Sequence, residues 1–267
     1  MPTLERPDGV EIHWEDQGRG PVVLVAHQIL WSYPQVYTDL FADLAGDHRV
    51  VTYDARGCGS SSRTGPYDTE TDAGDLLAVA TEAGGRAVAL AVGYGYNLAV
   101  RVAARRPDLV AALVSVQPAA AAMLPRSELK GSGVMAASDS VIEMLMQMMS
   151  TDPRTALRSV LAATNPELDH EALKDRVDRV SGYMSPEAAH DRAKAWIADD
   201  PSEHARALGD RLGILHSGSE PLFEGALAER VAELYPGSRI EQITGGPISS
   251  PHLVAERIRR LTDAIHR

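Results

Sequence analysis

The stretch Ala87-Val-Ala-Leu-Ala-Val-Gly-Tyr-Gly-Tyr-Asn97 joins a continuous apolar run to a glycine-rich turn. Such a run suits a β-strand that is buried on both faces of a parallel sheet. The segment from Asn97 to Arg105 has the length of a helix and closes just before Pro107, which cannot continue a helix. The stretch therefore predicts a buried strand, a sharp turn and a helix.

The same alternation of apolar runs and helix-length segments extends along most of the chain. The other predicted strands are Val22–Ala26, Arg49–Tyr53, Ala112–Val116, Leu212–His216 and Arg239–Ile243. The other predicted helices are Asp72–Thr81, Pro221–Tyr235 and Pro251–Ile265. Alternating strands and helices indicate an α/β fold with a mainly parallel, twisted sheet and helices on both faces.

Residues 125–208 break this alternation, because they contain no apolar strand run. They contain helix starts instead, of which Ser185-Pro186-Glu187 is an example: serine caps a helix well, and proline favours its first turn. We expect an inserted helical segment over 125–208, with a core made of residues 1–124 and 209–267.

Composition narrows the class of protein further. The chain has 267 residues, of which 44% are hydrophobic and 24% charged, as in ordinary soluble globular proteins. A net charge of −11 disfavours nucleic acids and anionic membranes as partners. No apolar run reaches the roughly 18 residues of a transmembrane helix, and Met1–Trp14 lacks the apolar core of a signal peptide. We expect a cytoplasmic protein with a small-molecule substrate or ligand and an undetermined oligomeric state.

Metal and cofactor chemistry is not indicated. Cys58 is the single cysteine, which excludes a disulfide framework and a zinc site built on cysteines. The histidines are scattered without metal-ligand spacing, so we expect no metal and no cofactor. Cys58 itself is expected to be a buried, unreactive thiol.

Three features resemble the α/β-hydrolase fold family, in its cap-bearing branch. The loop Asp54-Ala-Arg-Gly-Cys-Gly-Ser-Ser61 is similar to the D-x-R-G-x-G-x-S loop of the family. His27 ends the first long strand, where the family has a His-Gly oxyanion turn. The strand, turn and helix from Ala87 to Arg105 match the context of the nucleophile elbow. The resemblance covers essentially the whole chain and implies the α/β-hydrolase fold with an inserted helical cap.

The elbow departs from the G-x-S-x-G pattern of the family. Counted back from Pro107 without a gap, Gly93 takes the position of the nucleophile, and a register shift of two residues would place Gly95 there. Neither residue has the hydroxyl, thiol or carboxylate that covalent acyl transfer requires. Glycine adopts strained turns readily, so we expect the fold to survive this loss and serine-hydrolase chemistry to be lost.

The resemblance also locates the other two members of the catalytic triad. Glu220, before Pro221, matches the position of the acid, and glutamate is an accepted acid there. The histidine position holds Ile248, and His252 follows four residues later. A shifted turn would bring His252 to the site, whereas a regular helix start would place it on the surface. The triad is therefore expected to be degenerate.

Several nearby side chains are candidates for a role in the pocket. Gln28 replaces the glycine after His27, and it would either fill the space of a tetrahedral intermediate or offer an amide donor. Tyr94 follows the nucleophile position and would act as an acid or hydrogen-bond donor, or pack beneath the cap. Candidates for the pocket wall, which equally suit ordinary packing, are His27, Trp31, Tyr33, Gly93, Tyr96, Met144, Met148 and Ile248.

Three functions follow from these residues. The favoured one is a cofactor-independent, non-hydrolytic enzyme, namely a lyase, cyclase or isomerase, that acts on a small apolar oxygenated metabolite between core and cap. The expected setting is bacterial specialised metabolism. This rests on analogy with other activities hosted by the fold. The second is a hydrolase of an ester, lactone or epoxide that uses water and a displaced base. The third is a non-catalytic receptor or carrier.

Overall fold

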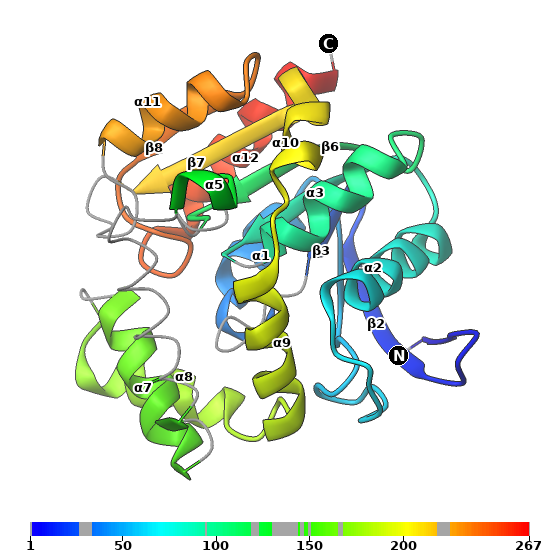
Figure 1. Ribbon diagram of the computed structural model, residues 1–267, viewed down its shortest axis with the longest axis vertical. Coiled ribbons are helices and arrows are strands. Elements are labelled where there is room, and N and C mark those ends of the chain that lie inside the picture. Colours follow the sequence, from blue (N-terminus) through cyan, green and yellow to red (C-terminus); the bar gives the residue numbers. More distant parts are fainter. Residues whose placement is uncertain are drawn as a thin grey trace.

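One sheet of eight strands runs through the computed structural model, in the order β1-β2-β4-β3-β5-β6-β7-β8 (Figure 1). The structure describes residues 2–26, 34–93, 95–118, 123–129, 144, 147–148, 151–164, 168–217 and 225–266. The strands are β1 (Thr3–Glu5), β2 (Glu11–Gly18), β3 (Val22–Ala26), β4 (Arg49–Tyr53), β5 (Ala87–Val92), β6 (Val110–Val116), β7 (Leu212–Ser217) and β8 (Arg239–Ile243). From β4 to β8 all neighbours are parallel, while β1 and β2 pair antiparallel.

All six strands predicted from apolar runs are confirmed. In β5 and β6 every residue is buried, as expected for strands covered on both faces. Strand β6 begins two residues earlier than predicted, at Val110. The apolar runs did not predict β1 and β2. Strand β2 lies toward one edge of the sheet, and its sequence, Glu-Ile-His-Trp-Glu-Asp-Gln-Gly, is mostly polar and exposed.

Helices cover both faces of this sheet, which confirms the predicted α/β class. Helices α1 (Thr38–Leu44) and α12 (Pro251–His266) pack against each other on one face. Helices α2 (Thr69–Ala83) and α3 (Gly95–Arg105) pack against each other on the other face, in front of the sheet in Figure 1. Helix α11 (Gly225–Leu234) contacts β8.

The described residues between β6 and β7 form helices and contain no named strand. They are α5 (Arg126–Leu129), α7 (Pro153–Thr164), α8 (His170–Val180), α9 (Pro186–Ala198) and α10 (Ser202–Leu208), followed by the 3₁₀ turn η2 (Gly209–Arg211). Helix α9 starts where predicted, and the Ser185 hydroxyl accepts a hydrogen bond from the Ala188 N–H at 3.2 Å. Helices α7 and α8 and the start of α9 lie below the layers of the sheet in Figure 1, whereas α10 packs on α3.

Helix α9 is tied to the core by charged side chains. Arg192 forms a buried ion pair with Asp72 of α2 and also donates to the Arg56 carbonyl at 2.8 Å. At the end of α9, Asp199 accepts hydrogen bonds from Asn97 and Arg101, both in α3. These contacts hold α9 against the two helices that cover the front of the sheet.

Within the described residues, no helix is long and apolar enough to cross a lipid bilayer.

Candidate functional site

The turn between β5 and α3 is built on two glycines with different constraints. Gly93 has a φ of 58°, in the left-handed region, and its N–H donates to the Val116 carbonyl at 3.3 Å. A Cβ atom on Gly95 would lie 2.8 Å from the carbonyl oxygen of Ala26, at the end of β3. The strained centre of the turn is thus Gly93, and Gly95 lets the start of α3 approach the backbone of β3. This spacing corresponds to the ungapped alignment with the elbow pattern.

Tyr96 lies in the first turn of α3 and is completely buried. Burial and the neighbouring Tyr235 hold the pKa of Tyr96 well above its usual value. Tyr235 donates a hydrogen bond to the Met123 carbonyl at 2.5 Å. The position of Tyr96 is therefore typical of packing in the protein interior.

Gln117 follows β6 at the carboxyl edge of the sheet, beside the elbow. Its φ of 49° makes it the one non-glycine residue with a positive φ among the described residues. Its N–H donates to the Leu215 carbonyl at 2.8 Å. A Cβ atom on Gly246, in the loop after β8, would lie 3.1 Å from Nε2 of Gln117. The Gln117 amide thus lies against the loop after β8. Gln117 combines a strained backbone conformation with a polar side chain.

The loop after β8 carries the residue at the histidine position of the family pattern. Ile248 is buried there, and the Gly246 N–H donates to the Ser249 hydroxyl at 2.9 Å. Ile248 belongs to the same apolar cluster as the core of the sheet.

His252 lies at the surface, in the first turn of α12, with 84% of its side chain exposed. Its Nδ1 forms a hydrogen bond with the carboxylate of Asp43 in α1, and Arg259 donates to the same carboxylate at 2.8 Å. Burial raises the pKa of Asp43, but the hydrogen bonds from His252 and Arg259 outweigh it, so the pKa lies below its usual value. In this structure His252 links α12 to α1.

The remaining candidates fall in two groups. Met144 is 53% exposed and Met148 is half-buried. The other candidates lie outside the described residues: His27, Gln28, Trp31, Tyr33, Tyr94 and Glu220.

Asp54 directly follows β4 and organises the loop that begins there. One carboxylate oxygen accepts a hydrogen bond from the Ser60 N–H at 2.8 Å, and the other accepts one from the Tyr183 hydroxyl. A Cβ atom on Gly59 would lie 2.2 Å from the Asp54 carboxylate, so only glycine fits there. Tyr183 was not predicted from the sequence, because it lies 129 residues away along the chain and no motif marks it.

The same loop is joined to the segment between α8 and α9 by backbone hydrogen bonds. The Gly59 N–H donates to the Tyr183 carbonyl at 2.8 Å, and the Ser185 N–H donates to the Gly57 carbonyl at 2.9 Å. Arg56 donates to Asp75 at 2.7 and 2.9 Å, deep in the core. The loop is therefore fixed both to the core and to the segment between α8 and α9.

Cys58, in the middle of this loop, is completely buried, as predicted. Burial raises the pKa of its thiol to about 12. Because the thiolate is the reactive form, a thiol in this environment is inert at neutral pH.

No group of three or more His, Cys, Asp or Glu side chains that could hold a metal ion is found in the part of the chain that the structure describes.

Comparison with known proteins agrees with this architecture. Residues 21–168, more than half of the chain, match the family model of the alpha/beta hydrolase fold. Three solved structures share the fold across nearly the whole length. An esterase from Exiguobacterium antarcticum is 20% identical, with a TM-score of 0.79 and 99% of both chains covered. A thermophilic esterase from Thermogutta terrifontis is 19% identical, with a TM-score of 0.77 and coverage of 99% of this chain and 97% of the other. An enol-lactonase from Burkholderia xenovorans LB400 is 20% identical, with a TM-score of 0.76 and both chains fully covered.

Proposed function

The chain belongs to the α/β-hydrolase fold family, and from this premise we propose that it is an enzyme that converts a small, largely apolar, oxygenated molecule without hydrolysis and without a cofactor. The reaction would be an elimination, a cyclisation or an isomerisation. The observation that carries the proposal is the elbow, where the strained residue between β5 and α3 is Gly93. An acyl-enzyme route requires a nucleophilic side chain at this point.

Lyases, cyclases and isomerases of oxygenated molecules need proton transfer and a stabilised oxyanion rather than a covalent nucleophile. In our proposal Tyr94, which follows Gly93 in the sequence, supplies the acid or the hydrogen-bond donor, and Gln28 supplies a second donor. The Gln117 amide, one strand away, supports a polar pocket at this edge, because strained backbone conformations concentrate at functional sites.

We also propose that residues 125–208 form a cap over this pocket and that residues 1–124 and 209–267 form the core. In support, the described residues between β6 and β7 form helices, and α9 is held to α2 and α3 by ion pairs. Such a cap would exclude water from the pocket, and a non-hydrolytic reaction requires this exclusion.

Hydrolysis with water as the nucleophile is a second candidate, favoured by the similarity to structures of two esterases and an enol-lactonase. This candidate needs a base near the elbow. The surface position of His252 and its hydrogen bond to Asp43 argue against it in that role, which leaves Glu220 at the acid position of the family pattern.

Activated aryl esters and a fluorophosphonate probe distinguish the candidates. We expect no turnover of 4-nitrophenyl butyrate above the buffer rate and no covalent labelling. Stoichiometric labelling would overturn the proposal, because it requires a nucleophile in the pocket. Ester turnover that disappears in Glu220→Gln or in His252→Ala would favour hydrolysis.

Native mass spectrometry of the purified protein for a co-purified small molecule provides the positive test. We expect the wild type to convert the released molecule, and Tyr94→Phe and Gln28→Ala to lose conversion, while Gln17→Ala at the surface of β2 does not. A molecule that binds unchanged, and still binds to both pocket variants, would indicate a receptor or carrier instead.

A further inference from the structure

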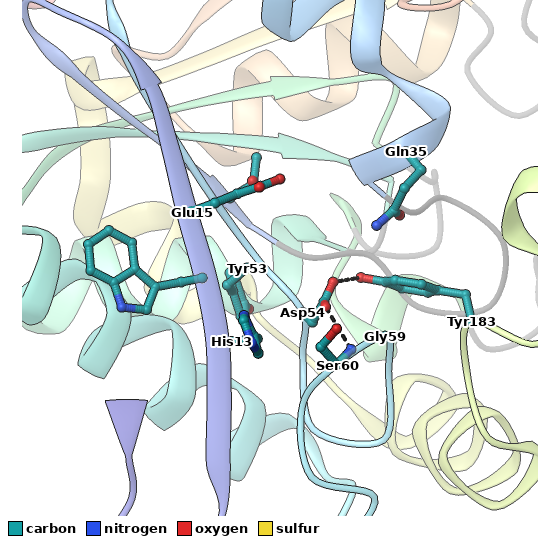
Figure 2. A pocket seen from close by; sticks show the side chains of 10 residues that line it. His13, Glu15, Gln35, Tyr53, Asp54, Gly59, Ser60 and Tyr183 are labelled. Atoms are coloured by element: carbon teal, nitrogen blue, oxygen red, sulfur yellow. Dashed lines mark hydrogen bonds between the residues drawn. The ribbon is translucent and has the colours of Figure 1, made fainter. Parts of the chain in front are cut away.

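A pocket lies where the segment between α8 and α9 meets the core. Its volume is about 290 Å³. One wall is formed by β2 and the end of β4 with its loop, and the opposite wall by Tyr183 and by Gln35 of the 3₁₀ turn η1 (Pro34–Val36) (Figure 2). In the sheet β3 lies between β4 and β5, so the strand that leads to Asp54 runs about 10 Å from the strand that leads to the elbow, at roughly 4.8 Å per strand.

The strands β2 and β4 supply a polar pair and an aromatic pair of residues to this pocket. Glu15 of β2 pairs with Thr52 of β4, and the next pair along is Trp14 with Tyr53. Directly paired residues share a face and successive pairs alternate, so Glu15 and Thr52 lie on the opposite face from Trp14 and Tyr53. Trp14 and Tyr53 are both buried and also line the pocket, whereas Glu15 is exposed there.

The carboxylate of Asp54 is held rigidly on the floor of the pocket. It accepts hydrogen bonds from the Tyr183 hydroxyl and the Ser60 N–H, drawn as dashed lines in Figure 2. Burial, Cys58 and the Asp54 charge hold the pKa of Tyr183 well above its usual value, so the phenol keeps its proton and its bond to Asp54. A carboxylate has about four lone-pair positions, so Asp54 retains capacity to accept further donors.

Two carboxylates line this pocket together with side chains that carry donors of their own, among them His13 and Trp14. Figure 2 shows Glu15, Gln35, Asp54 and Tyr183 around one opening. The Oε1 atom of Gln35 is buried and has no hydrogen-bond partner among the described residues. Neither lysine nor arginine is among the residues that line the pocket, although Glu15 and Asp54 both contribute carboxylates.

We propose that this pocket binds the ammonium group of a small organic amine. An ammonium group offers three donors and no acceptor, which matches two carboxylates and an unpartnered amide oxygen. Charge-assisted hydrogen bonds of this kind are roughly twice as strong as neutral ones. The rigid hold on Asp54 lowers the ordering cost of binding, because this acceptor is already in place. The proposal does not depend on the reaction at the elbow.

Isothermal titration calorimetry of the full chain with butane-1,4-diamine, at constant ionic strength and pH 7, tests the proposal. The neutral isostere butane-1,4-diol is the matched ligand. We expect saturable binding of the diamine at one site, and binding of the diol at least about tenfold weaker, because it lacks the charge. Equal binding of the two ligands, or no binding of the diamine, would overturn the assignment.

Variants then locate the site. Glu15→Gln is expected to weaken diamine binding about tenfold or more, and Gln35→Leu is expected to weaken it to a smaller extent. Glu11→Gln is the control, because it makes the same charge change on the same strand but lies outside the pocket. Glu15 and Glu11 are both exposed, so neither variant should alter the melting temperature. A diamine affinity that falls equally in both glutamate variants would show general charge attraction, and an affinity unchanged in Glu15→Gln would place the diamine elsewhere; either result contradicts the proposal.

Discussion

The guanidinium of Arg192 donates two hydrogen bonds to the carboxylate of Asp72, at 2.6 Å from Nε and 2.7 Å from Nη2. The two residues are 120 positions apart, and their side chains are only 1% and 2% exposed. Burial alone would lower the pKa of Arg192, but the Asp72 charge and its hydrogen bonds raise it above its usual value. The pair therefore fixes α9 on α2 through two groups that are both charged and both removed from water.

Removal of one partner of this pair should be strongly destabilising. Asp72→Leu leaves a buried, unpaired guanidinium, so the free energy of unfolding should fall by about 3–5 kcal/mol. The double variant Asp72→Leu/Arg192→Leu should lose less than Asp72→Leu alone, because it leaves no uncompensated charge. Urea unfolding followed by circular dichroism measures both. As a control, Asp108→Ala removes an exposed partner of Arg106 and should change stability by no more than about 0.5 kcal/mol. A double variant less stable than Asp72→Leu would contradict this account.

Replacement of two helical glycines by alanine should change the free energy of unfolding in opposite directions. Gly95→Ala should destabilise the protein by about 1–3 kcal/mol, because the new Cβ would stand 2.8 Å from the Ala26 carbonyl oxygen, a backbone atom. Gly74→Ala in α2 should stabilise it by roughly 0.5–1 kcal/mol, because alanine favours helices and the nearest atom is the end of the flexible Arg6 side chain at 3.4 Å. Thermal unfolding of the two variants compares the signs directly. A stabilising Gly95→Ala would mean that α3 does not approach β3 this closely.

Gln117 should be replaceable by glycine with a gain in stability. A non-glycine residue in the left-handed region costs about 1 kcal/mol, so Gln117→Gly should raise the free energy of unfolding by up to about that amount. Gln117→Ala keeps the strain and should bring no gain. Chemical denaturation of the three proteins measures the difference. Equal stability of the glycine and alanine variants would show that the conformation at this residue is unstrained.

Glu70 should contribute stability that disappears in acid. Hydrogen bonds from Arg105 lower the pKa of Glu70 to about 2, against 4.5 for the free side chain. A carboxyl group whose pKa is lowered by folding stabilises the folded state at any pH above its pKa in the unfolded chain. This contribution is lost as the pH falls toward its pKa in the folded protein. Glu70 is largely exposed, so solvent screens the pair, and Glu70→Gln should cost less than about 1 kcal/mol at pH 7. The gap between variant and wild type should narrow between about pH 4.5 and pH 2 in urea titrations. A gap that widens toward low pH would reverse the assigned sign.

The strands and helices that position the elbow could be predicted because their residues are buried on both faces. For that reason the run of β5 is apolar throughout, and the run of β6 contains one polar residue, Ser115. The start of α9 could be predicted from Ser185 and Pro186, because capping is a local property of a few residues. Strand β2 could not be predicted, because its own sequence is mostly polar and it is a strand through its pairing with β4.

The residues of the candidate sites were harder to predict. The strain at Gln117 leaves no trace in the sequence, because glutamine is not a residue that favours the left-handed region. Tyr183 reaches Asp54 only through the fold of the inserted helices. His252 lies four residues after Ile248 in the sequence, but the start of α12 places it against Asp43. Proximity along the chain therefore did not predict proximity in space.

The environment of Cys58 has a practical consequence for experiments on motion. Its thiol is the only one in the chain, and its proton stays bound well beyond neutral pH, so maleimide reagents leave it untouched in the native protein. A cysteine introduced on the exposed side of α9, for instance at Glu187, would be the single reactive position. Spin labels or fluorophores attached there would report on α9 alone, because no other thiol would carry a label. The native cysteine would not have to be removed first.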